Sequence, residues 1–380
     1  MTSRSETMLP GGLSARAFLE QHWGRAPLFV PKAFEHVSDL VDPNELAGAA
    51  CEPDIESRLV LGSDALDDWS SESGPFDEDR FDSLGPKGWT LLVQSVETWS
   101  EGVARLLDAF RALPAWALDD VMVSYATEGG GVGPHFDYYD VFLVQVQGER
   151  LWRTGQMCNA TTALRDNANL KLLADFEERQ SFYTKPGDML YVPAGTAHWG
   201  TSLSADCITC SIGFRAPSYR ELYERAVDEI FGALSEDLRV DASAASLDND
   251  VFEIPSLAVQ HLVKHWREVD EVTLTQAITR ALGCLATETR REVDESDIGH
   301  DGWEELEPRY APQPGTRMAY AALKENSFAA NLFVNGQTFE TPLSIAKAIC
   351  NAQISQAMAS DPQYLQLMQE LVERGWFYAR

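Results

Sequence analysis

The stretch Gly129-Gly-Gly-Val-Gly-Pro-His-Phe-Asp137 places an imidazole and a carboxylate two residues apart, directly after a glycine-rich turn. Alternate residues of a strand point to the same face, so the side chains of His135 and Asp137 can bind one metal ion together if the segment is extended. An imidazole nitrogen and a carboxylate oxygen are suitable ligands for a divalent transition metal. A His-x-Asp pair taken alone is most often a solvated surface pair, so the metal hypothesis needs support from the rest of the chain.

Five segments around this pair have the composition of β-strands. They are rich in β-branched and aromatic residues and are bounded by Gly, Pro and Asp. Long helices do not alternate with them, which favours an antiparallel barrel or jelly roll. The segments are Trp89–Val96, Val121–Tyr125, Val141–Val146, Met189–Val192 and Cys207–Phe214. We therefore expect a jelly-roll domain over residues 1–215.

A third metal ligand is predicted at His198, in Val192-Pro-Ala-Gly-Thr-Ala-His198, which follows another predicted strand. Two histidines and one carboxylate form the facial triad of non-haem Fe(II) oxygenases, which leaves positions open for a cosubstrate and dioxygen. Metal-binding cupins use the same fold without oxygenase chemistry. A cosubstrate site is therefore needed to distinguish an oxygenase from a metal-binding cupin.

Arg150 is a candidate for that cosubstrate site, and it lies just past the predicted strand Val141–Val146 and a short turn. An arginine deep in the barrel can hold the distal carboxylate of 2-oxoglutarate through two parallel hydrogen bonds. Arg153 is an alternative, and either arginine could be a surface charge. A hydroxyl group often helps to bind the same carboxylate, and the sequence leaves three candidates open. They are Ser124, Tyr125 and Thr127.

The sequence pattern changes after Arg215, where helical spacing of apolar residues replaces short strands. Ser218 and Glu221 form a predicted capping box at the start of a helix. Residues 216–295 are therefore predicted to be a helical region, interrupted by an acidic stretch over residues 237–250.

Residues 296–380 are predicted to form a third domain with a β-hairpin. Asn335-Gly336 lies between two apolar-alternating runs, which is a strong signal for a tight hairpin turn. Met318–Ala322 and Leu343–Met358 are predicted helices. Helices combined with one hairpin have the layout of a winged helix. The hairpin carries no basic cluster, so we expect a protein-contact or packing module.

The chain is strongly acidic, with 59 Asp and Glu against 30 Lys and Arg and a formal net charge of −29. This charge disfavours direct binding to nucleic acid and to an anionic membrane surface. It favours a basic partner through electrostatic steering, although it could serve solubility alone. The N-terminal residues do not have the pattern of a signal peptide. We therefore expect a cytoplasmic protein.

The stretch Val132-Gly-Pro-His-Phe-Asp-Tyr-Tyr-Asp-Val-Phe-Leu-Val-Gln145, followed by Gly148-Glu-Arg-Leu-Trp-Arg153, resembles the JmjC ribosomal oxygenases. Shorter matches extend over most of residues 15–220. Within the family, the pattern is most similar to the bacterial branch that hydroxylates an arginine. The resemblance implies an α+β fold, in which a double-stranded β-helix (jelly-roll, cupin) barrel precedes a helical dimerisation region and a C-terminal winged-helix domain.

The resemblance also implies a site and an activity. Fe(II) would be bound by His135, Asp137 and His198, and 2-oxoglutarate by Arg150. The implied reaction is 3-hydroxylation of an arginine in a basic ribosomal protein of the large subunit, carried out by a homodimer. Two alternatives remain, a histidine hydroxylase of another ribosomal protein and a metal-binding cupin without oxygenase activity. Four residues are candidates for binding the target arginine: Asp119, Asp120, Tyr138 and Tyr139.

Overall fold

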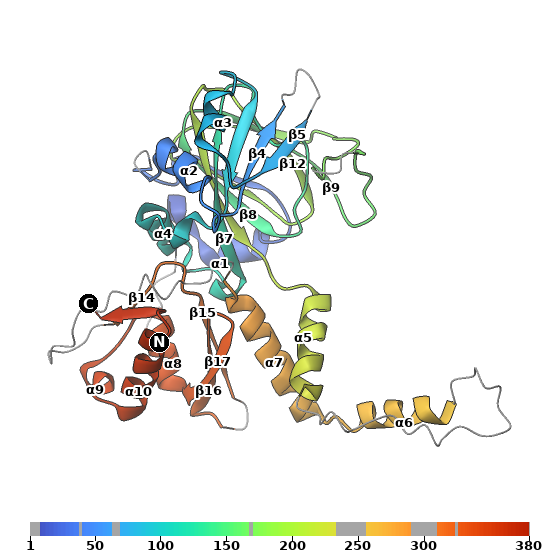
Figure 1. Ribbon diagram of the computed structural model, residues 1–380, viewed down its shortest axis with the longest axis vertical. Helices are drawn as coiled ribbons and strands as arrows, with labels where there is room; N and C mark the ends of the chain where they lie inside the picture. The colour runs from blue at the N-terminus through green and yellow to red at the C-terminus, as the bar shows by residue number, and fades with distance from the viewer. Residues whose placement is uncertain are drawn as a thin grey trace. The chain divides into compact units, whose positions relative to one another are not determined.

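The computed structural model describes residues 8–37, 40–62, 69–166, 170–232, 256–289, 310–323 and 326–379. The chain forms two compact units (Figure 1). The first comprises Met1–Ala216, Thr289–Thr316 and Leu365–Arg380, and the second Pro217–Glu288 and Arg317–Tyr364. In these described ranges, no helix combines the length and apolar character needed to cross a bilayer.

The first unit is built on an antiparallel sheet that has eight strands within the described residues, in the order β3-β11-β8-β13-β7-β6-β4-β5. The strands are β3 (Leu28–Val30), β4 (Ser57–Leu61), β5 (Ser70–Ser73), β6 (Trp89–Val93), β7 (Leu118–Ala126), β8 (Asp140–Gln147), β11 (Met189–Val192) and β13 (Cys207–Phe214). All five predicted strands lie in this sheet. The first of them ends at Val93, before a 3-10 turn at Val96–Thr98.

A smaller antiparallel sheet, β10-β9-β12, completes the jelly roll. Its strands are β9 (Arg150–Met157), β10 (Gln180–Thr184) and β12 (Thr196–Ser202). Five buried residues from β8, β9 and β11 form a cluster that we call the inner cluster. It consists of Val141, Leu143, Trp152, Leu190 and Val192. Since Trp152 comes from the small sheet and the other four from the large one, the inner cluster marks the interior of the barrel.

The opposite face of the large sheet packs against helices near the N-terminus. Phe142 and Val144 alternate with the inner residues of β8 and join this second cluster. Helices α1 (Ala15–Gln21), α2 (Pro43–Ala49) and α4 (Glu101–Leu106) each contribute a buried side chain to it. Strand alternation thus sorts the residues of the large sheet into an interior set and a helix-covered set.

The second unit begins with three helices, α5 (Tyr219–Phe231), α6 (Ser256–Arg267) and α7 (Glu271–Thr287). The predicted capping box is confirmed, because the Ser218 hydroxyl accepts from the Glu221 N–H and the Glu221 carboxylate accepts from the Ser218 N–H. Gly283 lets α7 approach the sheet that follows, since a Cβ at this position would lie 2.3 Å from the Phe333 ring. The predicted acidic stretch 237–250 lies outside the described residues.

The C-terminal part of the chain forms a three-stranded sheet with short helices. Its elements are β15 (Met318–Ala322), β16 (Ala329–Val334), β17 (Gln337–Pro342), α8 (Leu343–Cys350), α9 (Gln356–Ala359) and α10 (Pro362–Glu373). Strands β14 (Tyr310–Pro312) and β18 (Phe377–Ala379) form a separate pair. The Asn335-Gly336 turn is confirmed, with φ of 45° and 77° as a tight hairpin turn requires.

Two helix predictions for this region were wrong. Met318–Ala322 is a strand that pairs with β16, because hydrogen bonds to a neighbouring strand outweigh the weak helical preference of five residues. Leu343–Met358 is not one helix, since the chain leaves the helical conformation after Cys350 and Ala352 has a φ of 52°.

Candidate metal centre

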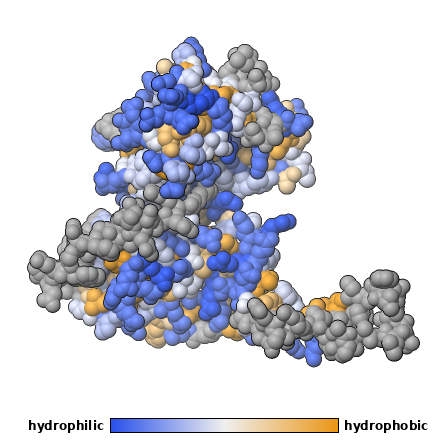
Figure 2. All heavy atoms as spheres, viewed as in Figure 1, coloured by the Kyte–Doolittle hydropathy of each residue, from blue (hydrophilic) through white to orange (hydrophobic). Residues whose placement is uncertain are grey.

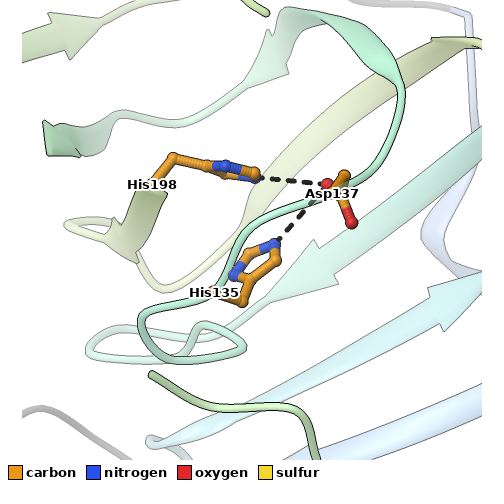
Figure 3. Close-up of side chains that lie close together, drawn as sticks. All are labelled: His135, Asp137 and His198. Atoms are coloured by element: carbon orange, nitrogen blue, oxygen red, sulfur yellow. Dashed lines mark ion pairs between the residues drawn. The ribbon is translucent and has the colours of Figure 1, made fainter. Parts of the chain in front are cut away.

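The structure brings His135, Asp137 and His198 together, with their ligand atoms all within 4.8 Å of one another (Figure 3). Asp137 Oδ2 lies 3.9 Å from His135 Nε2 and 3.5 Å from His198 Nε2. His198 is on β12, whereas His135 and Asp137 lie in the connection between β7 and β8. This connection is not the regular strand that we predicted, but an isolated antiparallel bridge pairs His135 with His198.

Backbone carbonyl groups orient both imidazoles. The Nδ1 of His135 lies 2.9 Å from the Gly133 carbonyl oxygen, and the Nδ1 of His198 lies 3.0 Å from the Thr196 carbonyl oxygen. Because a carbonyl oxygen can only accept, each Nδ1 carries the proton and each Nε2 keeps its lone pair for a metal. In both cases the carbonyl belongs to the residue two positions before the histidine. Any residue has a backbone carbonyl, so the sequence carries no signal for this contact.

His198 is buried, with 3% of its surface exposed. Burial, together with the nearby His135, lowers the pKa of His198 to about 4, and the Asp137 carboxylate only partly opposes this shift. The imidazole is therefore neutral at pH 7, as metal binding requires.

The donor set of this centre suits a non-haem Fe(II) ion. Two imidazole nitrogens and one carboxylate oxygen on one side of the metal form the 2-His-1-carboxylate arrangement. Among the residues that the structure describes, no further His, Cys, Asp or Glu joins the cluster. Three protein ligands leave coordination positions open, which distinguishes this centre from a closed structural site.

Arg150 lies inside the barrel, on the same face of the small sheet as His198. In the register of β9 with β12, Arg150 is opposite Ser202 and Thr154 is opposite His198. Only 4% of Arg150 is exposed, and its Nε and Nη2 have no hydrogen-bond partner among the described residues. A buried guanidinium with unpaired donors is a suitable site for an anion, and a carboxylate can accept from two of these donors at once.

The rival residue, Arg153, points to the other face of β9. Its guanidinium lies 4.7 Å from the Trp199 ring centroid and 3.8 Å from the Glu178 carboxylate. A side chain held outside the barrel cannot reach an anion beside the metal centre. Of the two arginines, only Arg150 lies inside the barrel, on the face of the small sheet that carries His198.

The three hydroxyl candidates have different environments. Ser124 pairs with Thr209, which in turn pairs with Gln145 on the inner face of β8, so Ser124 faces the interior. Tyr125 faces the helix-covered side and donates to Asp206 at 2.6 Å, and burial raises the pKa of its hydroxyl. Thr127 accepts from the backbone N–H of Trp89. Ser124 is therefore the candidate that lies in the barrel with Arg150.

Three of the four residues that we predicted for the arginine pocket lie together. A Cβ placed on Gly213 would lie 3.6 Å from a side-chain atom of Asp119 and 3.7 Å from atoms of Asp120 and Tyr139. Asp120 also accepts from the Ser95 N–H at 3.3 Å. Tyr138 does not join this group, because it is 67% exposed and packs against Phe136.

A jelly roll that holds two imidazoles and a carboxylate beside a buried arginine defines the class of cupin-type oxygenases with a JmjC domain. The JmjC domain family matches residues 105–222. The ribosomal protein uL16 3-hydroxylase of Escherichia coli K12 is 32% identical over 386 residues, which cover 95% of this chain and 96% of that protein. A probable ribosomal oxygenase of Haemophilus influenzae is 38% identical, over 57% of this chain and 53% of its own. The chain belongs to the JmjC ribosomal oxygenases.

Solved structures agree with this assignment. The ribosomal oxygenase YcfD from Escherichia coli in complex with cobalt and 2-oxoglutarate superimposes with a TM-score of 0.77 and 28% identity, over 98% of this chain and 99% of that one. The same protein with cobalt and succinic acid gives a TM-score of 0.73.

Proposed function

We propose that this protein is an Fe(II)- and 2-oxoglutarate-dependent oxygenase that hydroxylates an arginine side chain of the large-subunit ribosomal protein uL16. The observation that carries the proposal is a set of three candidate metal ligands in one barrel with a buried arginine, two of whose nitrogen donors have no partner among the described residues. The family supports it, because a uL16 3-hydroxylase is similar to this chain over nearly its whole length.

Each residue of the centre has a role in this proposal. His135, Asp137 and His198 would hold Fe(II), and Arg150 would neutralise the distal carboxylate of 2-oxoglutarate. When bound, iron and 2-oxoglutarate supply the oxidation of an unactivated C–H bond by dioxygen, with succinate and carbon dioxide as by-products. The inner cluster lines the barrel with apolar side chains, and the carbonyl groups that orient the imidazoles would fix the ligand geometry.

The charge of the protein supports a basic protein substrate. A net charge of −29 attracts a ribosomal protein that carries many lysines and arginines, and it repels RNA phosphates. Beside Gly213, Asp120 offers a carboxylate and Tyr139 an aromatic ring, the groups that a guanidinium group needs. In this proposal the enzyme captures the free ribosomal protein in the cytoplasm, before RNA covers its basic surface.

We also propose that residues 216–295 form the interface of a homodimer. Several large apolar side chains of α5 and α6 are exposed in the single chain, and Figure 2 shows apolar surface over α6. They include Tyr219, Tyr223, Val259, Leu262, Val263 and Trp266. A second copy of these helices would remove such surface from water. The hairpin β16–β17 and the helices around it support a winged-helix-like third domain over residues 296–380, used for protein contacts.

The proposed function is tested by incubating the protein with Fe(II), 2-oxoglutarate and purified uL16, followed by intact-mass analysis. We expect uL16 to gain one oxygen atom and succinate to form in equal amount. Fragmentation of the product should place the oxygen on an arginine. Oxygen on a histidine of another ribosomal protein would make this chain a histidine hydroxylase, and iron binding without succinate would make it a metal-binding cupin.

A further inference from the structure

The indole of Trp152 lies between the two parts of the candidate site. Trp152 is two residues after Arg150 on β9 and faces the same way, because alternate residues of a strand share a face. The Trp152 ring centroid is 5.4 Å from Arg150 Cζ and 6.2 Å from the His198 ring centroid. The indole therefore contacts the space between the metal ligands and the buried guanidinium.

The backbone of β12 fixes the plane of the Trp152 indole. A Cβ on Gly200 would lie 2.5 Å, 2.7 Å and 2.8 Å from Cζ3, Cη2 and Cε3 of Trp152, so the six-membered ring lies directly on Gly200. Cζ3 and Nε1 are on opposite sides of an indole. The Nε1 atom is therefore on the far side of the indole from the atoms that lie on Gly200.

The N–H of Trp152 has no acceptor in the described part of the chain, although the residue is only 5% exposed. Buried donors are almost always paired, because an unpaired donor loses its hydrogen bond to water without replacement. Two donor atoms of Arg150, Nε and Nη2, likewise have no partner within the described ranges. Three buried nitrogen donors on neighbouring side chains thus lack acceptors among the residues that the structure describes, which is the arrangement expected where an anionic ligand supplies several oxygens.

We propose that Trp152 is a cosubstrate-binding residue, whose indole N–H donates to the carboxylate of 2-oxoglutarate that Arg150 holds. This inference rests on the proposed function. Arg150 supplies the charge, and Trp152 supplies a neutral donor whose ring is held in place against Gly200. Substitution of Trp152 should weaken binding of 2-oxoglutarate and leave metal binding unchanged, because the indole is not a metal ligand.

The test uses the full-length protein loaded with Zn(II), which binds the same ligands but does not turn over. Calorimetric titration with 2-oxoglutarate should show affinity about tenfold lower for Trp152→Phe than for the wild type, as for loss of one hydrogen bond to a charged acceptor. Trp99→Phe is the matched control. Trp99 also has a buried N–H without a partner among the described residues, but it packs on the helix-covered side of the large sheet.

A second measurement keeps the inference testable if Trp152→Phe does not fold. In wild-type protein labelled with ¹⁵N-tryptophan, the Trp152 indole resonance should shift on addition of 2-oxoglutarate, and that of Trp99 should not. Overhauser contacts to Leu143 and Leu190, which pack with Trp152, identify the resonance. If 2-oxoglutarate binds while this resonance stays in place, or binds Trp152→Phe as tightly as wild type, the inference is wrong. If the wild type does not bind 2-oxoglutarate at all, the proposed function also fails.

Discussion

His135 and His198 are joined by two reciprocal backbone hydrogen bonds, from His135 N to His198 O at 3.0 Å and from His198 N to His135 O at 2.8 Å. This pairing ties the glycine-rich connection to β12 at the metal centre, and it places the two rings 4.2 Å apart. The backbone therefore positions both imidazoles before a metal binds, and a side-chain substitution can remove a ligand while leaving the pairing in place.

The first prediction concerns this ligand. Loss of a residue that only orients a metal ligand can lower metal affinity by up to about a hundredfold. His135→Ala removes a ligand itself, so it should lower Fe(II) affinity by more than about a hundredfold. Thermal unfolding of the metal-free protein should change little. His36→Ala, at an exposed position outside the site, is the control. If His135→Ala bound iron as tightly as the wild type, iron would not bind at this centre.

The second prediction separates Arg150 from Arg153. Arg150→Lys should raise the KM for 2-oxoglutarate by about tenfold or more, because lysine cannot donate two parallel hydrogen bonds to one carboxylate. Arg153→Lys should leave this KM near the wild-type value, since Arg153 lies outside the barrel against Trp199. Steady-state kinetics with succinate detection measure both. Equal effects of the two substitutions would contradict the placement of the cosubstrate at Arg150.

The third prediction concerns the contact between Gly200 and Trp152. Gly200→Ala should lower the free energy of unfolding by about 1–3 kcal/mol, because the added methyl group would overlap the indole ring. The control is Gly48→Ala in α2, where a Cβ meets no atom within 4 Å. There alanine should stabilise the protein by about 0.5–1 kcal/mol through its higher helix propensity. Urea unfolding measures both changes, and no loss of stability in Gly200→Ala would show that the barrel relaxes around the methyl group.

The fourth prediction follows from the pKa of His198, which is lowered from 6.5 to about 4 in the folded protein. Below pH 6.5 the unfolded chain takes up a proton that the folded chain excludes, so stability falls as the pH falls toward 4. For this residue the loss is about 2–3 kcal/mol over that range. His198→Gln should lack this loss, and urea unfolding of the metal-free proteins at about pH 7 and pH 4.5 measures the difference. An identical loss in both proteins would mean that His198 titrates normally.

The fifth prediction concerns the proposed dimer. Leu262→Glu with Trp266→Glu should convert the dimer to a monomer, because charges would replace exposed apolar side chains of α6. Tyr183→Glu, at an exposed position of the barrel, should leave the dimer intact. Light scattering measures the mass of both variants. A dimer that persists in the double variant would show that the interface lies outside α6.

The barrel and the grouping of His135, Asp137 and His198 could be predicted from the sequence because both show in local patterns. β-branched runs mark β7, β8 and β13, and a two-residue spacing marks His135 and Asp137. Strand alternation puts Arg150 and Arg153 on opposite faces of β9, but the sequence does not show which of these faces points into the barrel. Trp152 could not be recognised, because its role depends on the pairing of β9 with Gly200 on β12. Met318–Ala322 was misjudged because its partner strand determines its conformation.

The central claim is that the centre at His135, Asp137 and His198 hydroxylates an arginine of uL16. The most direct measurement is the intact mass of uL16 after incubation with the wild-type enzyme, Fe(II) and 2-oxoglutarate, with His135→Ala in parallel. We expect a gain of one oxygen atom on an arginine with the wild type and none with His135→Ala. An unchanged mass of uL16, with no succinate formed by an enzyme that binds iron, would contradict this claim.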